Sequence, residues 1–425
     1  MNLWTTWLAL PLTVRLMLLA LTGLLVGGQI NRGIYRLAWH QRWLTPWAPV
    51  PIGHPRRTWF DRVPVLGWWL LRRESRTHGR GFWLRGMLIE LATAAVFAGL
   101  YWWEVDQLGL IPRPPGVPLD AAPLQSMLHA QCFVHLLLYS LLMVATFIDF
   151  DEKTIPDAIT VTGTLAALGF MGLFPEALLP TTTPIGANAI QLHPLWAAGP
   201  PWPGWFATPQ CLSTVLACYA VWCFGLLDKR VTLRRGWWRG ATYLVVSIYR
   251  RRSWQLLLPV FLCGTTYLVG MFLVGGVRWQ AVASSVLGLA MGGGIIWGVR
   301  IVGRAALGVE AMGFGDVTLM AMIGAVVGWQ ASVIVFFLAP VAAVVIAVAQ
   351  WLATRSHYIA FGPYLSLAAM VLIVGWTRFW TDWLQPVFES LGNLIPALLL
   401  VCLLLMGLML WGWRLFRENV LGVGY

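Results

Sequence analysis

Two short acidic segments at the ends of apolar stretches are the parts of this sequence best suited to chemistry. Residues 147–157 read Phe-Ile-Asp-Phe-Asp-Glu-Lys-Thr-Ile-Pro-Asp and place Asp149 at the end of one apolar run. Residues 310–319 read Glu-Ala-Met-Gly-Phe-Gly-Asp-Val-Thr-Leu and place Asp316 where another begins. Two carboxylates that share a site hold one proton between them, so one can activate a water while the other donates to a carbonyl oxygen. The pair therefore predicts the chemistry of an aspartic protease.

Glycines flank Phe314 immediately before Asp316, at Gly313 and Gly315. Glycine lets the backbone turn or approach a neighbour closely, so this segment can admit water and an extended peptide beside the carboxylate. Taken alone, the segment has a second interpretation, in which Asp316 caps a helix and the glycines form a turn. An acidic residue at membrane depth usually indicates function. Pairing with Asp149 at a matching depth therefore favours the catalytic interpretation.

The composition indicates what must position these two residues. Of the 425 residues, 59% are hydrophobic and 11% are charged, against roughly 25% charged in a soluble domain. The apolar runs reach the roughly 20 residues that a membrane helix needs, and open sheets would leave backbone groups unpaired in lipid. We predict an all-α, polytopic membrane protein that forms a single membrane domain over 1–425. The eleven expected spans are 7–30, 86–103, 129–148, 158–174, 211–227, 254–275, 279–299, 317–328, 331–352, 361–376 and 394–413.

The distribution of positive charge sets the expected orientation. Arginines crowd the loop 31–85, where the only acids are Asp61 and Glu74, and such loops face the cytoplasm. Further basic residues follow the spans that end near 227 and 299. This topology brings both acidic segments to the cytoplasmic face. The formal charge of +12 is explained in the same way, so it predicts no nucleic-acid partner.

Several segments together resemble the type IV prepilin peptidase family, whose members are membrane aspartyl proteases. The strongest resemblance lies around the two acidic segments, and further matches occur near the N-terminus and after the ninth span. The matching segments are 27–37, 61–68, 85–91, 147–157 with Thr160, 313–319, and 360–364.

The resemblance implies a multi-pass endopeptidase of the bacterial inner membrane with its active site facing the cytoplasm. Such enzymes cleave the basic leader of type IV prepilins or pseudopilins, and here Asp149 and Asp316 would be the catalytic pair. Proteolysis by this pair needs no cofactor. Family members often methylate the new N-terminus as well, using S-adenosylmethionine.

Three departures from the family pattern qualify this expectation. The segment 73–82 has no cysteine where the family often carries two Cys-x-x-Cys pairs, and one histidine, His78, is not a zinc site. We therefore expect no structural zinc, and methylation stays open. The interval between the two aspartates is long, which we attribute to an inserted external loop and two extra helices over 175–275. With an extra C-terminal helix within 391–425, eight family-like spans remain. Thr318 stands where the family commonly has lysine.

A further set of residues are candidates for substrate binding. Glu90 either pairs with an arginine such as Arg36 or holds the substrate amine, and anchoring at the membrane surface explains Arg36 equally well. Asp157 follows a proline, so it is also a candidate helix cap. The full set is Asn31, Arg36, Glu90, Asp157, Phe361, Gly362 and Pro363.

Two functions from other classes stay open at this point. An ion- or proton-coupled transporter would use the acids differently, but transporters often have internal repeats and helices broken near the membrane midplane. This sequence has no evident repeat, and its acids lie at helix ends. The other alternative is a membrane scaffold descended from a peptidase.

Overall fold

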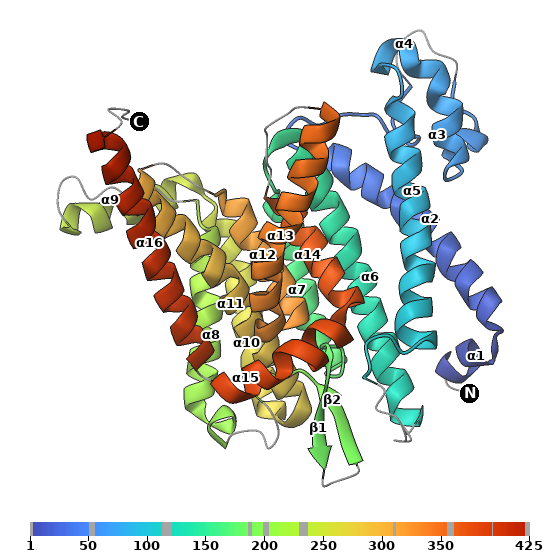
Figure 1. Ribbon diagram of the computed structural model, residues 1–425. Coiled ribbons are helices and arrows are strands. Elements are labelled where there is room, and N and C mark those ends of the chain that lie inside the picture. Colours follow the sequence, from blue (N-terminus) through green and yellow to red (C-terminus); the bar gives the residue numbers. More distant parts are fainter. Residues whose placement is uncertain are drawn as a thin grey trace.

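The protein is described from a computed structural model, and most of its described residues are helical (Figure 1). The described residues are 3–50, 56–112, 121–185, 189–198, 204–228, 237–308, 312–354, 361–392 and 394–420.

The helices follow the apolar runs of the sequence closely. The principal α-helices are α1 (Leu3–Ala9), α2 (Leu12–Leu37), α3 (Leu66–Leu70), α4 (Ser75–His78), α5 (Phe82–Tyr101), α6 (Ala121–Glu152), α7 (Asp157–Leu173), α8 (Pro209–Leu226), α9 (Trp237–Arg251), α10 (Trp254–Val274), α11 (Gly276–Leu307), α12 (Phe314–Val327), α13 (Trp329–Thr354), α14 (Gly362–Val374), α15 (Gln385–Leu391) and α16 (Leu394–Val420). The shorter 3-10 and π segments are η1 (Trp59–Arg62), η2 (Leu71–Glu74), η3 (Trp102–Asp106), η4 (Gly204–Ala207) and η5 (Thr377–Leu384).

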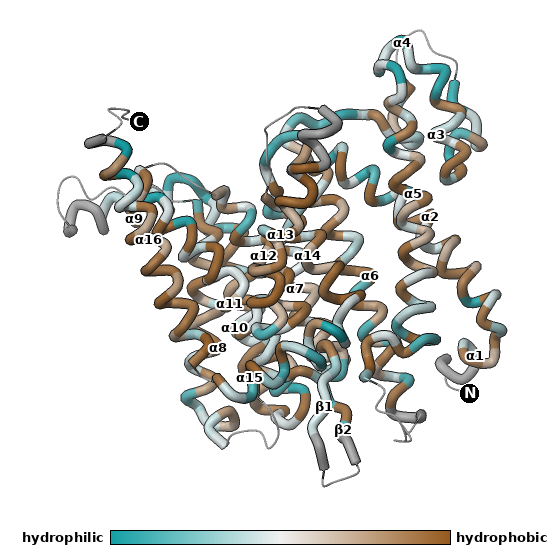
Figure 2. Tube along the Cα trace, in the orientation of Figure 1, coloured by the Kyte–Doolittle hydropathy of each residue, from teal (hydrophilic) through white to brown (hydrophobic). Residues whose placement is uncertain are grey.

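Eight of the described helices are long and apolar enough to cross a membrane. A ninth candidate is the pair Gly362–Val374 and Thr377–Leu391, which is bent by 77°. The prediction of an all-α, multi-pass membrane protein is confirmed, but the count of about eleven spans is not, because α7 and α12 are shorter apolar helices. Figure 2 shows the apolar residues along the middle of the bundle and the hydrophilic ones towards its ends.

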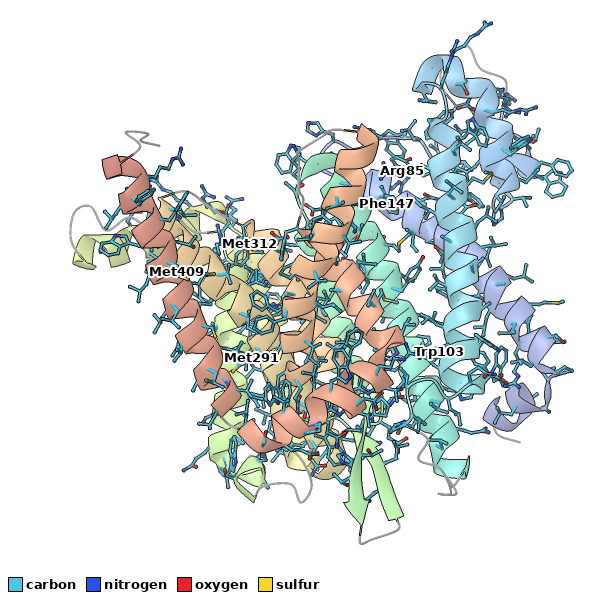
Figure 3. The ribbon with its side chains drawn as sticks, viewed as in Figure 1. Arg85, Trp103, Phe147, Met291, Met312 and Met409 are labelled. Atoms are coloured by element: carbon cyan, nitrogen blue, oxygen red, sulfur yellow. The ribbon has the colours of Figure 1, made fainter. Side chains whose placement is uncertain are left out.

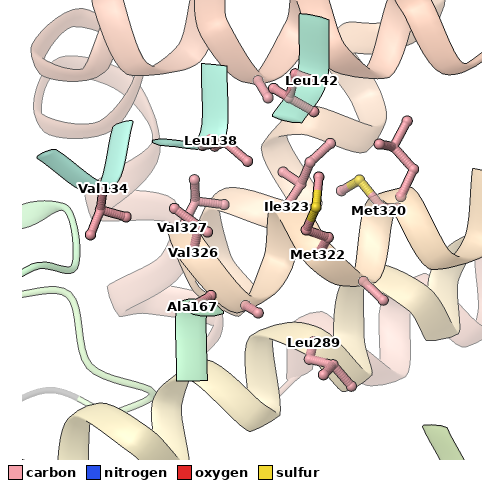
Figure 4. Close-up of a cluster of buried hydrophobic side chains, with 14 of the residues drawn as sticks. Val134, Leu138, Leu142, Ala167, Leu289, Met320, Met322, Ile323, Val326 and Val327 are labelled. Atoms are coloured by element: carbon pink, nitrogen blue, oxygen red, sulfur yellow. The ribbon is translucent and has the colours of Figure 1, made fainter. Parts of the chain in front are cut away.

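The helix α12 forms the centre of the bundle. Every residue from Asp316 to Val327 is buried, as expected for a helix that is apolar on all sides. Glycines let α11 approach α12 closely, since a Cβ built on Gly288 would lie 2.1 Å from the backbone oxygen of Gly324. Figure 4 shows side chains of α6, α7 and α11 converging on α12. The backbone that carries Asp316 is therefore held from several directions.

The pair α2–α5 stands to one side of this bundle and is joined to it through α6 (Figure 1). Arg85 at the start of α5 forms an ion pair with Asp151 (2.8 Å) and its guanidinium lies 4.7 Å from the ring centre of Phe147 (Figure 3). Glu152 accepts hydrogen bonds from the backbone N–H groups of Trp39 and His40. The acidic end of α6 thus fastens the N-terminal helices to the bundle.

The external loop that we predicted at the start of 175–275 contains a folded element that the sequence did not indicate. The strands β1 (Pro180–Ile185) and β2 (Ala189–Pro194) pair antiparallel. Trp376 Nε1 donates to the backbone oxygen of Pro180 (2.7 Å), and Trp380 Nε1 donates to Thr181 Oγ1 (2.9 Å). The hairpin is therefore held against the end of α14 by specific hydrogen bonds.

The helices predicted to be additions pack on one side of the core. The helices α8 and α10 contact each other and α11, and α16 also lies along α11. A Cβ built on Gly298 of α11 would lie 3.1 Å from a methyl group of Leu403 on α16. Residues 421–425 of the predicted C-terminal extension lie outside the described part of the chain. Whether these helices are insertions relative to the family remains a prediction.

Candidate active site

The structure brings the two acidic segments together at one end of the bundle. Asp149 lies in the last turn of α6 and Asp316 in the first turn of α12, and the two carboxylates are close enough to interact electrostatically. Both residues are buried, with 5% and 8% of their surface exposed. In Figure 3, Phe147 and Met312, near the respective aspartates in sequence, lie towards the end of the bundle opposite the hairpin. Two distant parts of the chain thus supply one buried pair of carboxyl groups.

Ile155, in the link between α6 and α7, joins the elements that carry this pair. A Cβ built on Gly315 would lie 3.0 Å from the Cβ of Ile155, and one built on Gly362 would lie 2.8 Å from its Cδ1. The N-terminal turns of α12 and α14 therefore both rest on Ile155. The absence of side chains at these two glycines is what allows the approach.

Gly362 also lies directly against Asp149. A Cβ built on Gly362 would lie 2.6 Å from Asp149 Oδ2, closer than a methyl group can approach. This oxygen is buried and has no hydrogen-bond partner in the described part of the chain. Phe361 and Pro363 flank Gly362 at the start of α14, where Pro363 occupies the first turn as the sequence predicted. One oxygen of the pair is thus available to a polar group that enters the site.

Asp316 is not the N-cap residue of α12. The N-cap residue is Gly313, Asp316 lies in the first turn, and no side chain makes a capping hydrogen bond. The Oγ1 of Thr318 donates to the backbone oxygen of Gly315 (3.0 Å). The glycines therefore begin the helix, and Asp316 lies in its first turn.

The capping interpretation of Asp157 is also wrong. Pro156 occupies the N-cap position of α7, and no side-chain capping hydrogen bond forms there. Asp157 is the first residue of the helix, where a negative charge is favourable because of the helix dipole. Its side chain is exposed.

Asn31, Arg36 and Glu90 form part of a separate region between α2 and α5. The predicted pair between Glu90 and Arg36 is wrong, because Arg36 lies over the ring of Trp43, 4.7 Å from its centre. Glu90 instead accepts hydrogen bonds from Trp68 Nε1 (2.8 Å), the backbone N–H of Val65 (2.5 Å) and Asn31 Nδ2 (3.4 Å). Sequence reasoning missed Trp68 and Val65 as partners, although both lie in the segment 61–68 that carries the family resemblance.

Ion pairs hold the loop between α2 and α5. Asp61 accepts hydrogen bonds from the Thr58 backbone N–H (2.7 Å) and from Arg73 (2.8 Å). Burial alone would raise the pKa of Asp61, but these hydrogen bonds and the Arg73 charge lower it below its usual value. Glu74 is buried and pairs with Arg57 (3.1 Å). The segment 73–82 is therefore tied down by charged side chains.

Two parts of the chain match models of known protein families. Residues 21–104 match the model of the bacterial peptidase A24 N-terminal domain, and residues 250–348 match that of the type IV leader peptidase family. The second range includes Asp316, whereas Asp149 lies outside both ranges. No solved structure gives a significant match.

Several curated relatives bear the name prepilin leader peptidase/N-methyltransferase. That of Aeromonas salmonicida (strain A449) is 31% identical over 132 residues, which are 30% of this chain and 43% of the relative. That of Stutzerimonas stutzeri is 26% identical over 178 residues, 40% of this chain and 58% of the relative. That of Myxococcus xanthus (strain DK1622) is 31% identical over 166 residues, which are 37% of this chain and 42% of the relative. The chain thus matches about half the length of these relatives.

A multi-pass helical membrane protein with a buried pair of carboxyl groups is the class that the fold and the site define. Two family models and several named relatives support the type IV leader peptidase family as the one that this chain resembles.

Proposed function

We propose that this protein is a membrane aspartyl endopeptidase that removes the basic leader of type IV prepilins or pseudopilins. The observation that carries the proposal is the pair Asp149 and Asp316, both buried and close enough to interact across the ends of α6 and α12. The matches to this family support the substrate class.

The proposed mechanism assigns a different protonation state to each carboxyl group. Two neighbouring carboxylates avoid ionising together, so one is ionised and one is protonated at the start. The ionised group takes a proton from a water as its oxygen attacks the carbonyl carbon of the scissile bond, and the protonated group donates to the carbonyl oxygen. The tetrahedral intermediate then collapses, the C–N bond breaks, and the leaving amine receives a proton.

The surroundings of the pair suit this chemistry. Oδ2 of Asp149 has unused acceptor capacity among the described residues, so it can bind the water. The close approach of Gly315 and Gly362 to Ile155 keeps the backbone of both helix starts near the carboxyl groups without side chains in between. We assign Gly313 and Gly315 to shaping this backbone, and Phe361, Gly362 and Pro363 to the wall on the Asp149 side.

We also propose that the site faces the cytoplasm across the bacterial inner membrane. The pair lies at the end of the bundle that carries the arginine-rich loop between α2 and α5 (Figure 1). Basic segments of this kind stay on the cytoplasmic side during insertion. A basic leader would reach the site from that compartment.

Proteolysis by two carboxyl groups needs no cofactor, and we propose none. Methylation of the new N-terminus would need S-adenosylmethionine. In bifunctional family members the loop that matches 73–82 accompanies methylation. Here ion pairs such as that of Arg73 with Asp61 hold this segment. We propose that this loop needs no structural zinc. Proteolysis is therefore the activity that we assign first.

The test is co-expression with a prepilin, followed by mass spectrometry of its N-terminus, which reports cleavage and methylation together. Asp149→Asn and Asp316→Asn should each abolish cleavage while the protein still accumulates in the membrane. Asp106→Asn is the matched control, because Asp106 is exposed and lies in η3, far along the chain from the pair. Undiminished cleavage by either active-site variant would overturn the proposal, and ion flux in liposomes without proteolysis would favour the transporter.

A further inference from the structure

A cavity lined by aromatic rings lies at the end of the bundle opposite the aspartate pair. This hairpin cavity has a volume of about 250 Å³ and lies between β1, β2, the segment that follows β2, the start of α13, and α15. Figure 1 shows the hairpin and α15 together at that end. The described residues that line the cavity include none of those assigned to the peptidase site.

Aromatic side chains form one wall of the hairpin cavity. The ring of Phe388 packs against those of Trp329 and Trp380, with ring centres 5.6 and 5.3 Å away. Trp329 Nε1 donates to the backbone oxygen of Ala197 (2.9 Å), and Trp380 Nε1 donates to Thr181 Oγ1 (2.9 Å). The indole N–H groups therefore hold the frame of the cavity together, and the ring carbons provide its apolar wall.

Gln330 presents a buried acceptor to the cavity. The residue lines the cavity and is 6% exposed. Its Nε2 donates to the backbone oxygen of Trp196 (2.8 Å), which fixes the orientation of the amide because a carbonyl can only accept. Oε1 is therefore an acceptor, and it is buried without a hydrogen-bond partner in the described ranges.

His193 presents a second buried acceptor. It also lines the cavity and is 7% exposed. Nδ1 lies 2.9 Å from the backbone oxygen of Pro194, so Nδ1 carries the proton and Nε2 accepts. Burial lowers the pKa of His193 below its usual value, so the ring is neutral at neutral pH. Nε2 is buried and likewise has no partner among the residues that the structure describes.

The two acceptors indicate the chemistry of a ligand. Buried polar groups are nearly always hydrogen-bonded, so a ligand that donates to both would complete the site. Both acceptors are uncharged, and the Glu389 carboxylate on the same cavity is exposed and accepts from Gln385 Nε2 (2.8 Å). A cation in the buried part would lack a counter-charge there. Hydroxyl groups donate without carrying charge, and the Thr183 hydroxyl on the strand side can donate or accept in return.

We propose that the hairpin cavity binds one ring of a neutral saccharide. The C–H face of the ring packs on Phe388 and Trp329, and two of its hydroxyl groups donate to Gln330 Oε1 and His193 Nε2. Pockets for drug-sized ligands have volumes of about 300–1,000 Å³, so this smaller cavity suits a single ring. The inference does not rest on the proposed peptidase activity. In the proposed orientation the cavity faces away from the cytoplasm, so the ring belongs either to a glycan or to a free sugar outside the membrane.

Isothermal titration calorimetry on the full-length protein in lipid nanodiscs tests the proposal. The preparation avoids glycoside detergents, because their sugar headgroups would compete for the site. The probes are glucose, N-acetylglucosamine and the linear oligomers of each, with choline as the cationic comparison. We expect at least one saccharide to bind with a Kd of about 1 mM or lower, at least tenfold more tightly than choline. Tighter binding of an oligomer than of its monomer would indicate a glycan, and equal binding would indicate a free sugar.

Substitutions in the cavity locate the binding. His193→Phe removes the Nε2 acceptor and should weaken saccharide binding at least tenfold. Phe388→Leu should weaken it severalfold, and it keeps an apolar side chain at a half-buried position, so it provides a second route if His193→Phe lowers the melting temperature. Ser390→Ala is the matched control, because Ser390 is exposed on α15 and is not among the lining residues. It should bind as the wild type does.

The proposal is overturned if no saccharide binds, or if choline binds as tightly as the best saccharide. Wild-type saccharide binding by both His193→Phe and Phe388→Leu would also overturn it, because the sugar would then bind elsewhere. Cleavage assays on the same preparations keep the two functions apart. A protein that cleaves prepilin but binds no saccharide loses only this site, and one that binds saccharide through His193 but never cleaves loses only the peptidase.

Discussion

Gly362→Ala is the perturbation that tests the active-site geometry most directly. The added methyl group would lie 2.6 Å from Asp149 Oδ2 and 2.8 Å from Ile155 Cδ1. Ordinary van der Waals contact begins near 3.4 Å, so the carboxyl group or the start of α14 must move by about 0.8 Å. A displacement of about 1 Å can cost about 100-fold in rate. We therefore expect kcat for prepilin cleavage to fall about 100-fold, with a smaller change in KM.

Stability measurements separate this effect from general damage. Overpacking of a well-packed interior costs about 1–3 kcal/mol, so the variant should melt at a lower temperature but remain folded. Gly169→Ala is the matched control, because a Cβ at this helical position of α7 meets no atom within 4 Å. It should retain full activity. Wild-type cleavage by Gly362→Ala would refute the proposed position of α14 against Asp149.

Three further predictions concern the aspartates and the loop. Asp149→Asn and Asp316→Asn should each abolish cleavage in a detergent-based peptidase assay, and the double variant should lose no more than either single one because the residues act as a unit. Glu74→Gln should reduce the free energy of unfolding by about 3 kcal/mol and lower the melting temperature, because it leaves the buried Arg57 without its partner charge. An unchanged melting temperature would contradict this prediction. The pKa of Asp61 is lowered in the folded state, so its contribution to stability is complete above its usual value of about 3.9 and is lost as the pH falls through the lower folded value. Limited proteolysis of the loop as a function of pH should therefore show acid sensitivity below about pH 4, and Asp61→Asn should weaken that dependence.

Several features of this protein follow from local sequence pattern. The apolar composition determines a membrane location, because such a surface is not stable in water, and the positions of the helices follow from the apolar runs. Arginine asymmetry predicts that the ends of α6 and α12 lie on one side, and the structure agrees. The segments around Asp149 and Asp316 carry the family resemblance without any knowledge of their contacts.

Other features depend on contacts between residues far apart in the chain. Ile155 receives Gly315 and Gly362 at the same place, which no helical periodicity reveals because the three residues lie in different elements. The strands β1 and β2 form within the segment that we expected to be an external loop. Trp376 and Trp380 supply hydrogen bonds to β1 that only the packed bundle brings within reach.

Glu90 shows what the local sequence predicts and what only the tertiary contacts decide. The sequence marks it as an acid inside an apolar helix, and the excess of nearby arginines suggests an ion pair. The tertiary structure instead surrounds it with the Trp68 indole and the Val65 backbone. Composition and periodicity determine which residues enter the membrane, because burial of apolar surface is additive along the chain. Which polar groups meet there is decided by packing, because a hydrogen bond depends on distances of a few tenths of an ångström.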